Sequence, residues 1–241
     1  MSGVPLIAVS GLAIGYAGRE VIAQADLKLH AGERLALLGD NGAGKSTLLQ
    51  ALVGLLPSTR GTIEAFGKAR RTEADFREVR LKAGLVFQDP DDQLFCPTVI
   101  EDVAFGPLNL GQSMAEAKAT AMAVLDRLGL AGFADRVTHR LSGGEKRLIS
   151  IAAVLAMEPE VLLLDEPTTG LDRAAYERLC QLLLDLPQAM IVVSHDPVFL
   201  ARLANRGLLL RDGRTHAGTL HTHDHLHSHA HFHFDDGTHH D

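Results

Sequence analysis

Short apolar runs recur along the chain and predict its buried strands. They lie at 35–38, 84–87, 161–164 and 190–193. Runs of this length without polar alternation are typical of parallel strands that are covered on both faces. Residues 6–38 differ, because alternation such as Leu27-Lys28-Leu29 predicts an antiparallel layer that leads into the first buried strand. The pattern therefore predicts an α/β fold.

The region between the second and third runs is predicted to be mostly helical, from residue 98 to residue 157. Ala115 to Leu128 carries an alanine- and leucine-rich repeat that favours helix, and an apolar-periodic helix runs from Leu148 to Met157. The polar, turn-rich segment Gln88–Gln93 joins this insertion to the preceding strand. We therefore expect a helical subdomain at about 89–158.

A glycine-rich segment follows the strand at 35–38 and precedes a predicted helix. It reads Gly39-Asp40-Asn41-Gly42-Ala43-Gly44-Lys45-Ser46-Thr47. Glycines at this spacing let successive backbone N–H groups converge on phosphates, and the following helix adds positive potential. Lys45 would reach the β- and γ-phosphates, and the Ser46 hydroxyl would ligate Mg²⁺. We interpret the segment as a phosphate-binding loop of the kind that binds nucleotides, rather than as a turn that binds nothing. Its binding residues are Gly39, Asn41, Gly42, Ala43, Gly44, Lys45, Ser46 and Thr47.

Two carboxylates follow the buried strand at 161–164, in the sequence Asp165-Glu166-Pro167. Ligands bind to open α/β sheets at the carboxyl ends of the strands, so this is a favourable place for chemistry. We expect Asp165 to hold Mg²⁺ and Glu166 to polarise the attacking water. Taken alone, the pair is a weak signal that is more typical of a simple strand end. The phosphate loop earlier in the chain makes it a strong one.

Five further segments accompany these two motifs. They contain Tyr16, Gln88, Ser142-Gly143-Gly144, Gly170-Leu171-Asp172 and His195. Read singly, each has a simple structural explanation. In this order the seven motifs resemble the ATP-binding cassette (ABC) ATPases, over residues 6 to about 215. The resemblance implies a P-loop ABC nucleotide-binding domain at 1–215, with a RecA-like core, an antiparallel β subdomain and a helical signature subdomain.

The resemblance also assigns roles to single residues. It implies that Tyr16 stacks on adenine, that Gln88 senses the γ-phosphate and contacts Mg²⁺, and that His195 contacts the γ-phosphate. Ser142, Gly143 and Gly144 of one copy would cover the phosphate loop of another in a head-to-tail dimer. The partner is either a second copy or a paralogue. One departure from the family pattern is Glu145-Lys146-Arg147-Leu148, so we expect the basic contacts after the signature glycines to be shifted or lost.

Composition narrows the possible partners. The formal net charge is −7 and no basic cluster is present, which argues against nucleic acid as the main partner. No apolar run approaches the roughly 18 residues needed to cross a bilayer. Composition therefore predicts a cytoplasmic protein, and the resemblance implies that it binds, as a peripheral subunit, to membrane transporter proteins.

A second resemblance concerns the segment around Gln88. The run from Phe87 to Phe95, followed by Thr98 to Pro107, is similar to the ATPase subunits of energy-coupling-factor importers. Such importers carry vitamins or transition-metal ions. The same acidic run could instead be a solvated turn.

Histidines at the end of the chain favour a metal over a vitamin. Of thirteen histidines, ten lie between His216 and His240, and from His221 to His233 they occupy every second position. Imidazole ligates Ni²⁺, Co²⁺, Cu²⁺ and Zn²⁺. We expect residues 216–241 to form a disordered metal-binding tail, because such a composition can hardly bury a core. The expected ligands for Ni²⁺ or Co²⁺ are His221, His223, His225, His227, His229, His231 and His233.

The sequence thus predicts the ATPase subunit of a nickel or cobalt importer, and several alternatives stay open. One is an importer of a vitamin such as biotin. A soluble cassette ATPase outside transport is another, and a metal-storage protein with an accessory ATPase is a third. The histidines could also be a purification tag or a metal buffer unrelated to transport. The choice between nickel and cobalt does not follow from ligand chemistry, because affinity order is not biological delivery.

Overall fold

The computed structural model describes residues 3–16, 19–223 and 229–234, with the backbone only for Tyr16, 219–223 and 229–234. The described strands are β1 Ile7–Tyr16, β2 Arg19–Leu29, β3 Arg34–Leu38, β4 Arg60–Ala65, β5 Lys68–Arg70, β6 Ala83–Val86, β7 Val161–Asp165, β8 Ala189–Val193, β9 Arg206–Arg211, β10 Arg214–His223 and β11 His229–Phe234. The α-helices are α1 Lys45–Leu52, α2 Glu73–Arg80, α3 Val99–Asn109, α4 Met114–Arg127, α5 Gly143–Leu155, α6 Arg173–Asp185 and α7 Pro197–Leu203. Short 3₁₀ turns are η1 Pro90–Asp92, η2 Ala131–Phe133 and η3 Thr138–Arg140.

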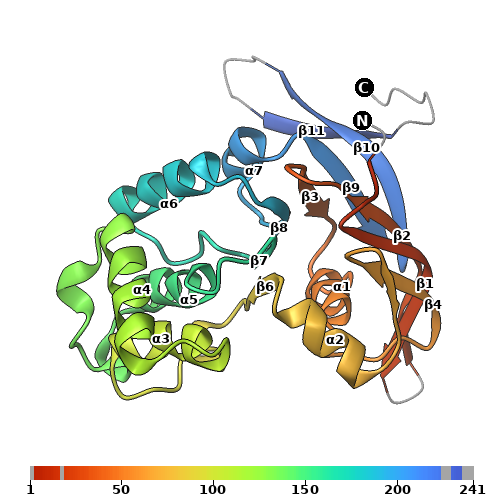
Figure 1. Cartoon of the computed structure of the whole chain (residues 1–241). Helices are drawn as coiled ribbons and strands as arrows, with labels where there is room; N and C mark the ends of the chain where they lie inside the picture. Colours follow the sequence, from red (N-terminus) through yellow and green to blue (C-terminus); the bar gives the residue numbers. More distant parts are fainter. Residues whose placement is uncertain (1–2, 17–18, 224–228, 235–241) are drawn as a thin grey trace.

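The strands form one curled mixed sheet with the order β5-β4-β1-β2-β10-β9-β3-β8-β7-β6, and β11 pairs with β10 (Figure 1). Strands β9, β3, β8, β7 and β6 are parallel to one another, whereas β5, β4, β1 and β2 pair antiparallel. The predicted α/β fold is confirmed, and the expected antiparallel strands form one part of the same sheet. The four apolar runs are the strands β3, β6, β7 and β8.

Strand β7 shows why an uninterrupted apolar run was needed. Leu162 and Leu164 are buried in the cluster that includes the helical region, while Val161 and Leu163 are buried in the cluster that includes α1 and the antiparallel strands. Successive strand residues point to opposite faces, so the interior of a strand that is covered on both faces is apolar at every position. Both faces of the parallel sheet are therefore core, and the site lies at the strand ends.

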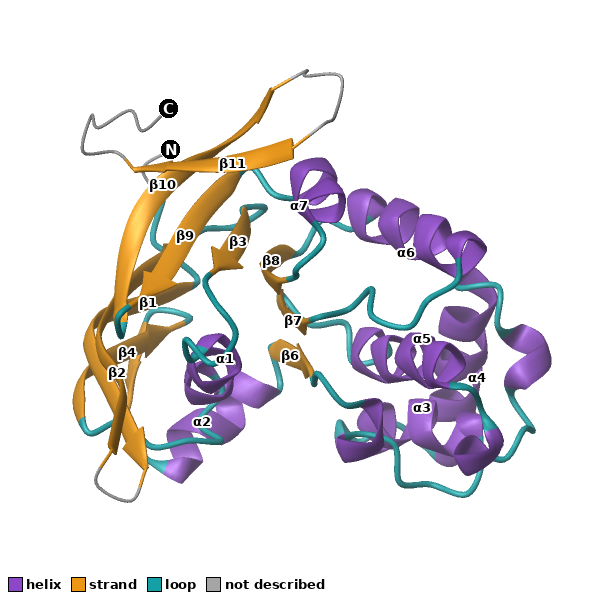
Figure 2. Ribbon diagram, turned by 180° about the vertical axis from the view of Figure 1, so that it is seen from behind, coloured by secondary structure: helices purple, strands orange, loops and turns teal. Residues whose placement is uncertain are grey.

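The helices α3, α4 and α5 lie together on one side of β6, β7 and β8, away from the antiparallel strands (Figure 2). They are the helices expected between residues 98 and 157, and α4 falls within one residue of the predicted bounds. Three N-terminal caps help to define them: Thr98, Ser113 and Ser142 each form a capping box with the glutamate three residues later. No helix in the described ranges is both long and apolar enough to span a bilayer.

The end of the chain differs from the disordered tail that we expected from residue 216. In the structure β10 continues to His223, and β11 pairs with it antiparallel. The physical reason is that the histidines alternate with residues such as Leu220 and Phe232, which is the period of a strand. The free edge of β10 offers the hydrogen-bonding groups that such a segment needs. His225 and His227 lie outside the described residues.

Candidate functional site

The phosphate loop connects β3 to α1, and glycine is required at both of its ends. Gly39 has φ +146°, and a Cβ atom there would lie 2.4 Å from the Leu210 carbonyl oxygen. Gly44 caps α1 in the left-handed region with φ 103°. These backbone angles are available to glycine and strained for other residues. The loop thereby curls so that the amino end of α1 faces the cavity, where backbone N–H groups favour an anion.

Lys45 is held inside this loop. Its side-chain Nζ donates hydrogen bonds to the Gly39 carbonyl at 2.7 Å and the Asp40 carbonyl at 3.0 Å. Burial lowers the pKa of the Lys45 ammonium, and the nearby carboxylates of Glu166 and Asp165 oppose that shift. The lysine is therefore pre-positioned beside the loop, ready to meet a negative ligand.

Asp165 ends β7 and is almost completely buried, with 4% of its surface exposed. Burial raises the pKa of its carboxyl group, while the Ser46 hydroxyl bonds to it and Lys45 and Arg147 act in the opposite direction. Its Oδ1 atom has no hydrogen-bond partner among the described residues. A buried, unpaired carboxylate oxygen beside a hydroxyl is a donor set of the kind that Mg²⁺ prefers. The residues present therefore fit this ion.

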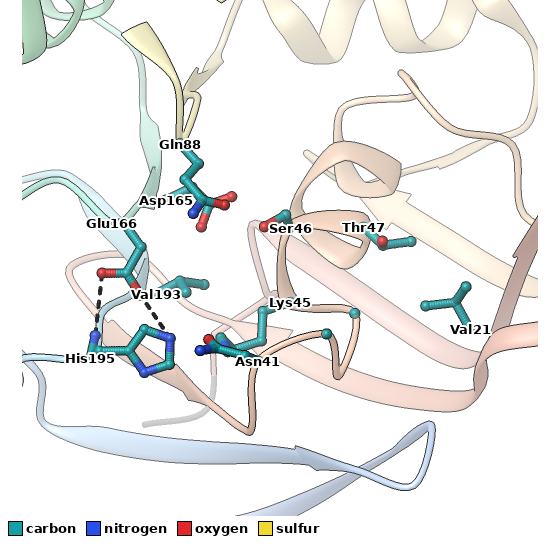
Figure 3. Close-up of a pocket in the computed structure, with 12 residues that line it drawn as sticks. Val21, Asn41, Lys45, Ser46, Thr47, Gln88, Asp165, Glu166, Val193 and His195 are labelled. Carbon is teal, nitrogen blue, oxygen red and sulfur yellow. Dashed lines mark hydrogen bonds and ion pairs between the residues drawn. The ribbon is translucent and has the colours of Figure 1, made fainter. Parts of the chain in front are cut away.

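Glu166 adopts an unusual backbone conformation, with φ 50°. A non-glycine residue in this backbone conformation lowers stability by about 1–3 kcal/mol, and the conformation persists only where the surrounding structure holds it. Here the Glu166 N–H donates to the Val193 carbonyl oxygen at 2.9 Å. The turn directs the carboxylate away from the core toward His195, whose backbone N–H donates to Glu166 Oε2 at 3.3 Å (Figure 3). His195 Nε2 lies 3.5 Å from Glu166 Oε1. Burial raises the pKa of Glu166, and the bond from His195 partly offsets this.

These groups line one cavity of about 270 Å³ (Figure 3). Its lining comes from β2, the phosphate loop and α1, the end of β6, the end of β7 and the end of β8. The lining residues are Val21, Asn41, Gly42, Gly44, Lys45, Ser46, Thr47, Gln88, Asp165, Glu166, Val193 and His195. Most of the residues predicted to meet nucleotide or Mg²⁺ are thus brought together. Val21 and Val193 were not predicted, because an apolar wall residue leaves no motif in the sequence.

Comparison with known proteins identifies the family. A family model described as ABC transporter matches residues 22–169, which is more than half of the chain. An ABC transporter ATP-binding protein of Brucella suis is 55% identical over 219 residues, which make up 91% of each chain. The chain is an ABC transporter ATPase. It hydrolyses ATP, and the hydrolysis is coupled to transport.

Two other comparisons add detail about relatives of this ABC ATPase. The cobalt import ATP-binding protein CbiO of Rhodobacter capsulatus is 47% identical over 218 residues, covering 88% of this chain and 78% of that protein. A solved ATP-binding cassette, dimeric and bound to ADP and Pi after hydrolysis, matches with a TM-score of 0.79. That match has 28% identity and covers 86% of this chain and 95% of the other.

The signature residues of the ABC ATPase lie apart from the cavity. Ser142, Gly143 and Gly144 begin α5 and are absent from the lining, and Ser142 and Gly143 are exposed. A Cβ at Gly144 would lie 2.6 Å from the Gly170 carbonyl oxygen, so the signature turn packs against the loop that leads to α6. Within one copy, the signature and the phosphate loop do not meet. Tyr16 lies at the end of β1, opposite Arg19, and its side chain is outside the described part.

We expected the basic contacts after the signature glycines to be shifted or lost, and in the structure both Lys146 and Arg147 contact the segment that carries Gln88. Arg147 is buried, and its guanidinium donates to the carbonyl oxygens of Phe87, at 2.5 Å, and Gln88. Lys146 Nζ lies 2.5 Å from Asp91 Oδ1. These contacts fasten α5 to the segment that carries Gln88, and only the folded chain reveals them. Burial lowers the pKa of Arg147, while Asp165, Asp89 and Glu166 counteract that effect.

Proposed function

We propose that this chain is the ATP-binding subunit that energises import of nickel or cobalt through integral membrane partner subunits. The single observation that carries the ATPase part is the cavity in which the phosphate loop, the two carboxylates and His195 converge. The metal part rests on two supports. A protein named for cobalt import is 47% identical to this chain, and ten histidines lie between His216 and His240.

The roles proposed for the site residues follow from their geometry. The loop N–H groups and Lys45 bind the phosphates of ATP, because they form the positive wall of the cavity. Glu166 lines the cavity beside His195, where it would orient the attacking water and accept its proton. Burial raises the pKa of Glu166, which improves it as a base. His195 would donate to the γ-phosphate from the same side.

Ser46, Gln88 and Asp165 would hold Mg²⁺, since all three line the cavity and offer oxygen atoms. When bound, the ion supplies positive charge to the β- and γ-phosphates. Tyr16 is proposed to stack on the adenine. It closes the β1–β2 turn, and Val21 further along β2 is already part of the lining.

Ser142, Gly143 and Gly144 are proposed to complete the site of a second copy, or of a paralogue, in a head-to-tail dimer. Ser142 and Gly143 are exposed at the start of α5, where the amino end of the helix favours an incoming phosphate. The dimeric relative bound to ADP and Pi supports this arrangement. In one copy alone, the cavity has only the phosphate-loop half of such a site.

A surface groove beside Gln88 supports docking of a membrane partner. It lies between the end of α1, α2, β6 and α3, and its apolar lining includes Leu55, Phe95, Phe105 and Met157. Phe95 and Phe105 stack edge to face at 4.8 Å, and 66% and 44% of their surfaces stay exposed. Exposed aromatic pairs on a hollowed surface are typical of interfaces. Docking here would place the chain at the cytoplasmic face of the membrane.

The test is transport by the assembled complex. The tagged chain would be purified from membranes with its partner proteins, reconstituted in liposomes and supplied with ATP and radioactive nickel or cobalt. We expect ATP-dependent uptake of one of these metals, and no uptake in the Glu166→Gln complex. Uptake of biotin or another vitamin with neither metal would overturn the substrate. Absence of any membrane partner would favour a soluble ATPase outside transport.

A further inference from the structure

Strands β10 and β11 form a hairpin whose register pairs histidines across the two strands. His221 lies opposite His231, and His223 lies opposite His229. The neighbouring pairs contain no such match, since Leu220 lies opposite Phe232 and Thr222 opposite Ala230. We call the paired parts of these strands, residues 218–223 of β10 and His229–Phe234 of β11, the histidine hairpin.

Strand geometry places the four paired histidines on one face of the hairpin. Residues two apart along a strand share a face, and directly opposite residues in an antiparallel pair share it too. His221 and His223 are two apart, as are His229 and His231. Leu220, Phe232, Thr222 and Ala230 occupy the other face by the same rule. The alternation in the sequence and the register in the structure therefore agree.

The spacing of these four positions suits one metal ion. Cβ atoms of opposite residues in an antiparallel pair are about 4.5–5.5 Å apart, and residues two apart along a strand are separated by about 6.5–7 Å. A rectangle of this size is within the reach of four imidazole ligands around one ion, for which metal–nitrogen distances are about 2.0–2.1 Å. Imidazole is a ligand for late divalent transition metals such as Ni²⁺, Co²⁺, Cu²⁺ and Zn²⁺.

The hairpin extends the sheet of the folded domain, so the backbone positions of its histidines are held before a metal ion binds. β10 pairs with β9 from Arg214 to Gly218 and only then continues into the hairpin. β11 lies beside α7 (Figures 1 and 2). Ligands held in register lose less conformational freedom on binding than the same histidines on a free coil. None of the residues that line the nucleotide cavity belongs to these two strands.

We propose that the histidine hairpin is a transition-metal site in which His221, His223, His229 and His231 bind one divalent ion from a single face. The site depends on the pairing of these histidines, not on the number of histidines in the tail. It is independent of what the transporter carries, so a metal-binding hairpin and a vitamin importer are compatible.

Variants that keep the composition unchanged test this pairing. The β11 exchange consists of His229→Ala, Ala230→His, His231→Phe and Phe232→His, which moves two imidazoles to the other face. The double exchange adds Leu220→His, His221→Leu, Thr222→His and His223→Thr, which makes both histidine pairs again on that face. All three full-length proteins have the same amino-acid composition. Any difference in metal affinity between them therefore results from the positions of the histidines.

Calorimetric titration with NiCl₂, and with CoCl₂ followed by visible absorption, gives the readout. The parent should bind one ion tightly, and the β11 exchange should bind about 100-fold more weakly, because paired ligands make later coordination steps intramolecular. The double exchange should recover most of the affinity and the cobalt absorption bands. Equal binding by parent and β11 exchange would overturn the pairing. So would a double exchange that stays weak, or a parent without a tight site.

Discussion

The nucleotide cavity and the histidine hairpin are built in opposite ways. The cavity collects side chains from five separate segments, including Val21, Lys45 and Glu166, whereas the hairpin uses two strands that are neighbours in sequence. The geometry of the first is therefore fixed by the whole sheet, and that of the second by local register. Single substitutions in the cavity should therefore have severe effects. In the hairpin, the positions of the residues should matter more than which residues are present.

The two regions also differ in the burial of charged side chains. Lys45, Asp165 and Glu166 are all buried, and two of the carboxylate oxygens there have no hydrogen-bond partner among the described residues. Buried charges without full pairing cost stability and are kept where function needs them. The hairpin is an edge extension beyond Gly218, and the core strands do not pair with β11. Substitutions in the cavity are therefore expected to change the stability of the folded chain, whereas removal of the hairpin is not.

The largest effect is expected from Glu166→Gln. The amide keeps the shape of the side chain but cannot accept a proton, so ATP hydrolysis should fall by about 10²–10⁴-fold. ATP binding should persist, and Ni²⁺ binding at the hairpin should not change. The measurements are steady-state ATPase rates, nucleotide titration and metal titration. Glu160→Gln is the matched control, because Glu160 is exposed and directly precedes the strand that ends at Asp165. Near-normal turnover of the Glu166 variant would remove this residue from the mechanism.

Lys45→Ala should instead weaken binding of ATP itself. A hydrogen bond between an ammonium and phosphate contributes about 1.5–3 kcal/mol, so the dissociation constant should rise roughly 10- to 150-fold. Fluorescent nucleotide titration measures it directly. Lys82→Ala is a suitable control, because Lys82 is exposed and pairs with Glu160 at 2.9 Å outside the cavity. An unchanged dissociation constant would mean that the loop N–H groups alone hold the phosphates.

The sequence predicted most of the nucleotide site because its residues belong to motifs with fixed spacing. The phosphate loop, Asp165 and Glu166 each follow an apolar strand, and the strand ends meet at one edge of the sheet. The same reasoning could not find Arg147. Its partners are main-chain carbonyls about sixty residues earlier, and a carbonyl is present at every residue.

The tail was harder to predict for a different reason. Composition argued for disorder, because histidine-rich segments bury little apolar surface. The alternation that makes a strand was visible, but a strand also needs a partner. β10 supplies that partner by extending the sheet past Gly218, and this follows only from the fold. The metal-binding histidines stay a prediction, now with a defined pairing.

Arg147 connects the cavity to the helical region, and Arg147→Met should expose that link. The variant leaves the carbonyl oxygens of Phe87 and Gln88 without their buried donor, which should lower the free energy of unfolding by about 1–3 kcal/mol. Urea unfolding measures the change. Lys146→Met is the control, because its ion pair with the exposed Asp91 should contribute under about 1 kcal/mol. Equal losses in the two variants would contradict a special role of the buried contact.

Asp165→Asn should stabilise the chain without nucleotide while abolishing hydrolysis. Burial raises the pKa of Asp165 above its ordinary 3.8, so its contribution to stability is present below that pH and is lost as the pH rises through the raised value. The neutral amide avoids this loss, and a gain of about 0.5–2 kcal/mol is expected at pH 7. Thermal unfolding from pH 4 to pH 8 tests this, with the gap between variant and parent widening as the pH rises. A difference in stability between variant and parent that decreases as the pH rises would contradict a raised pKa of Asp165.

The smallest effect on catalysis is expected from removing the hairpin. Truncation after Gly218 keeps the pairing of β10 with β9, which spans Arg214 to Gly218, and deletes every residue of β11. No residue that lines the nucleotide cavity is removed, so ATPase activity should stay within about twofold of the parent. Tight Ni²⁺ binding should disappear in the same protein. Truncation after Arg211 is the contrasting variant, because it also removes the strand that pairs with β9. That loss should lower the melting temperature of the domain, whereas the shorter deletion should leave it nearly unchanged. If ATPase activity falls with the hairpin alone, the two regions are coupled, and α7 is the element to examine, because it contacts β11 and begins next to His195.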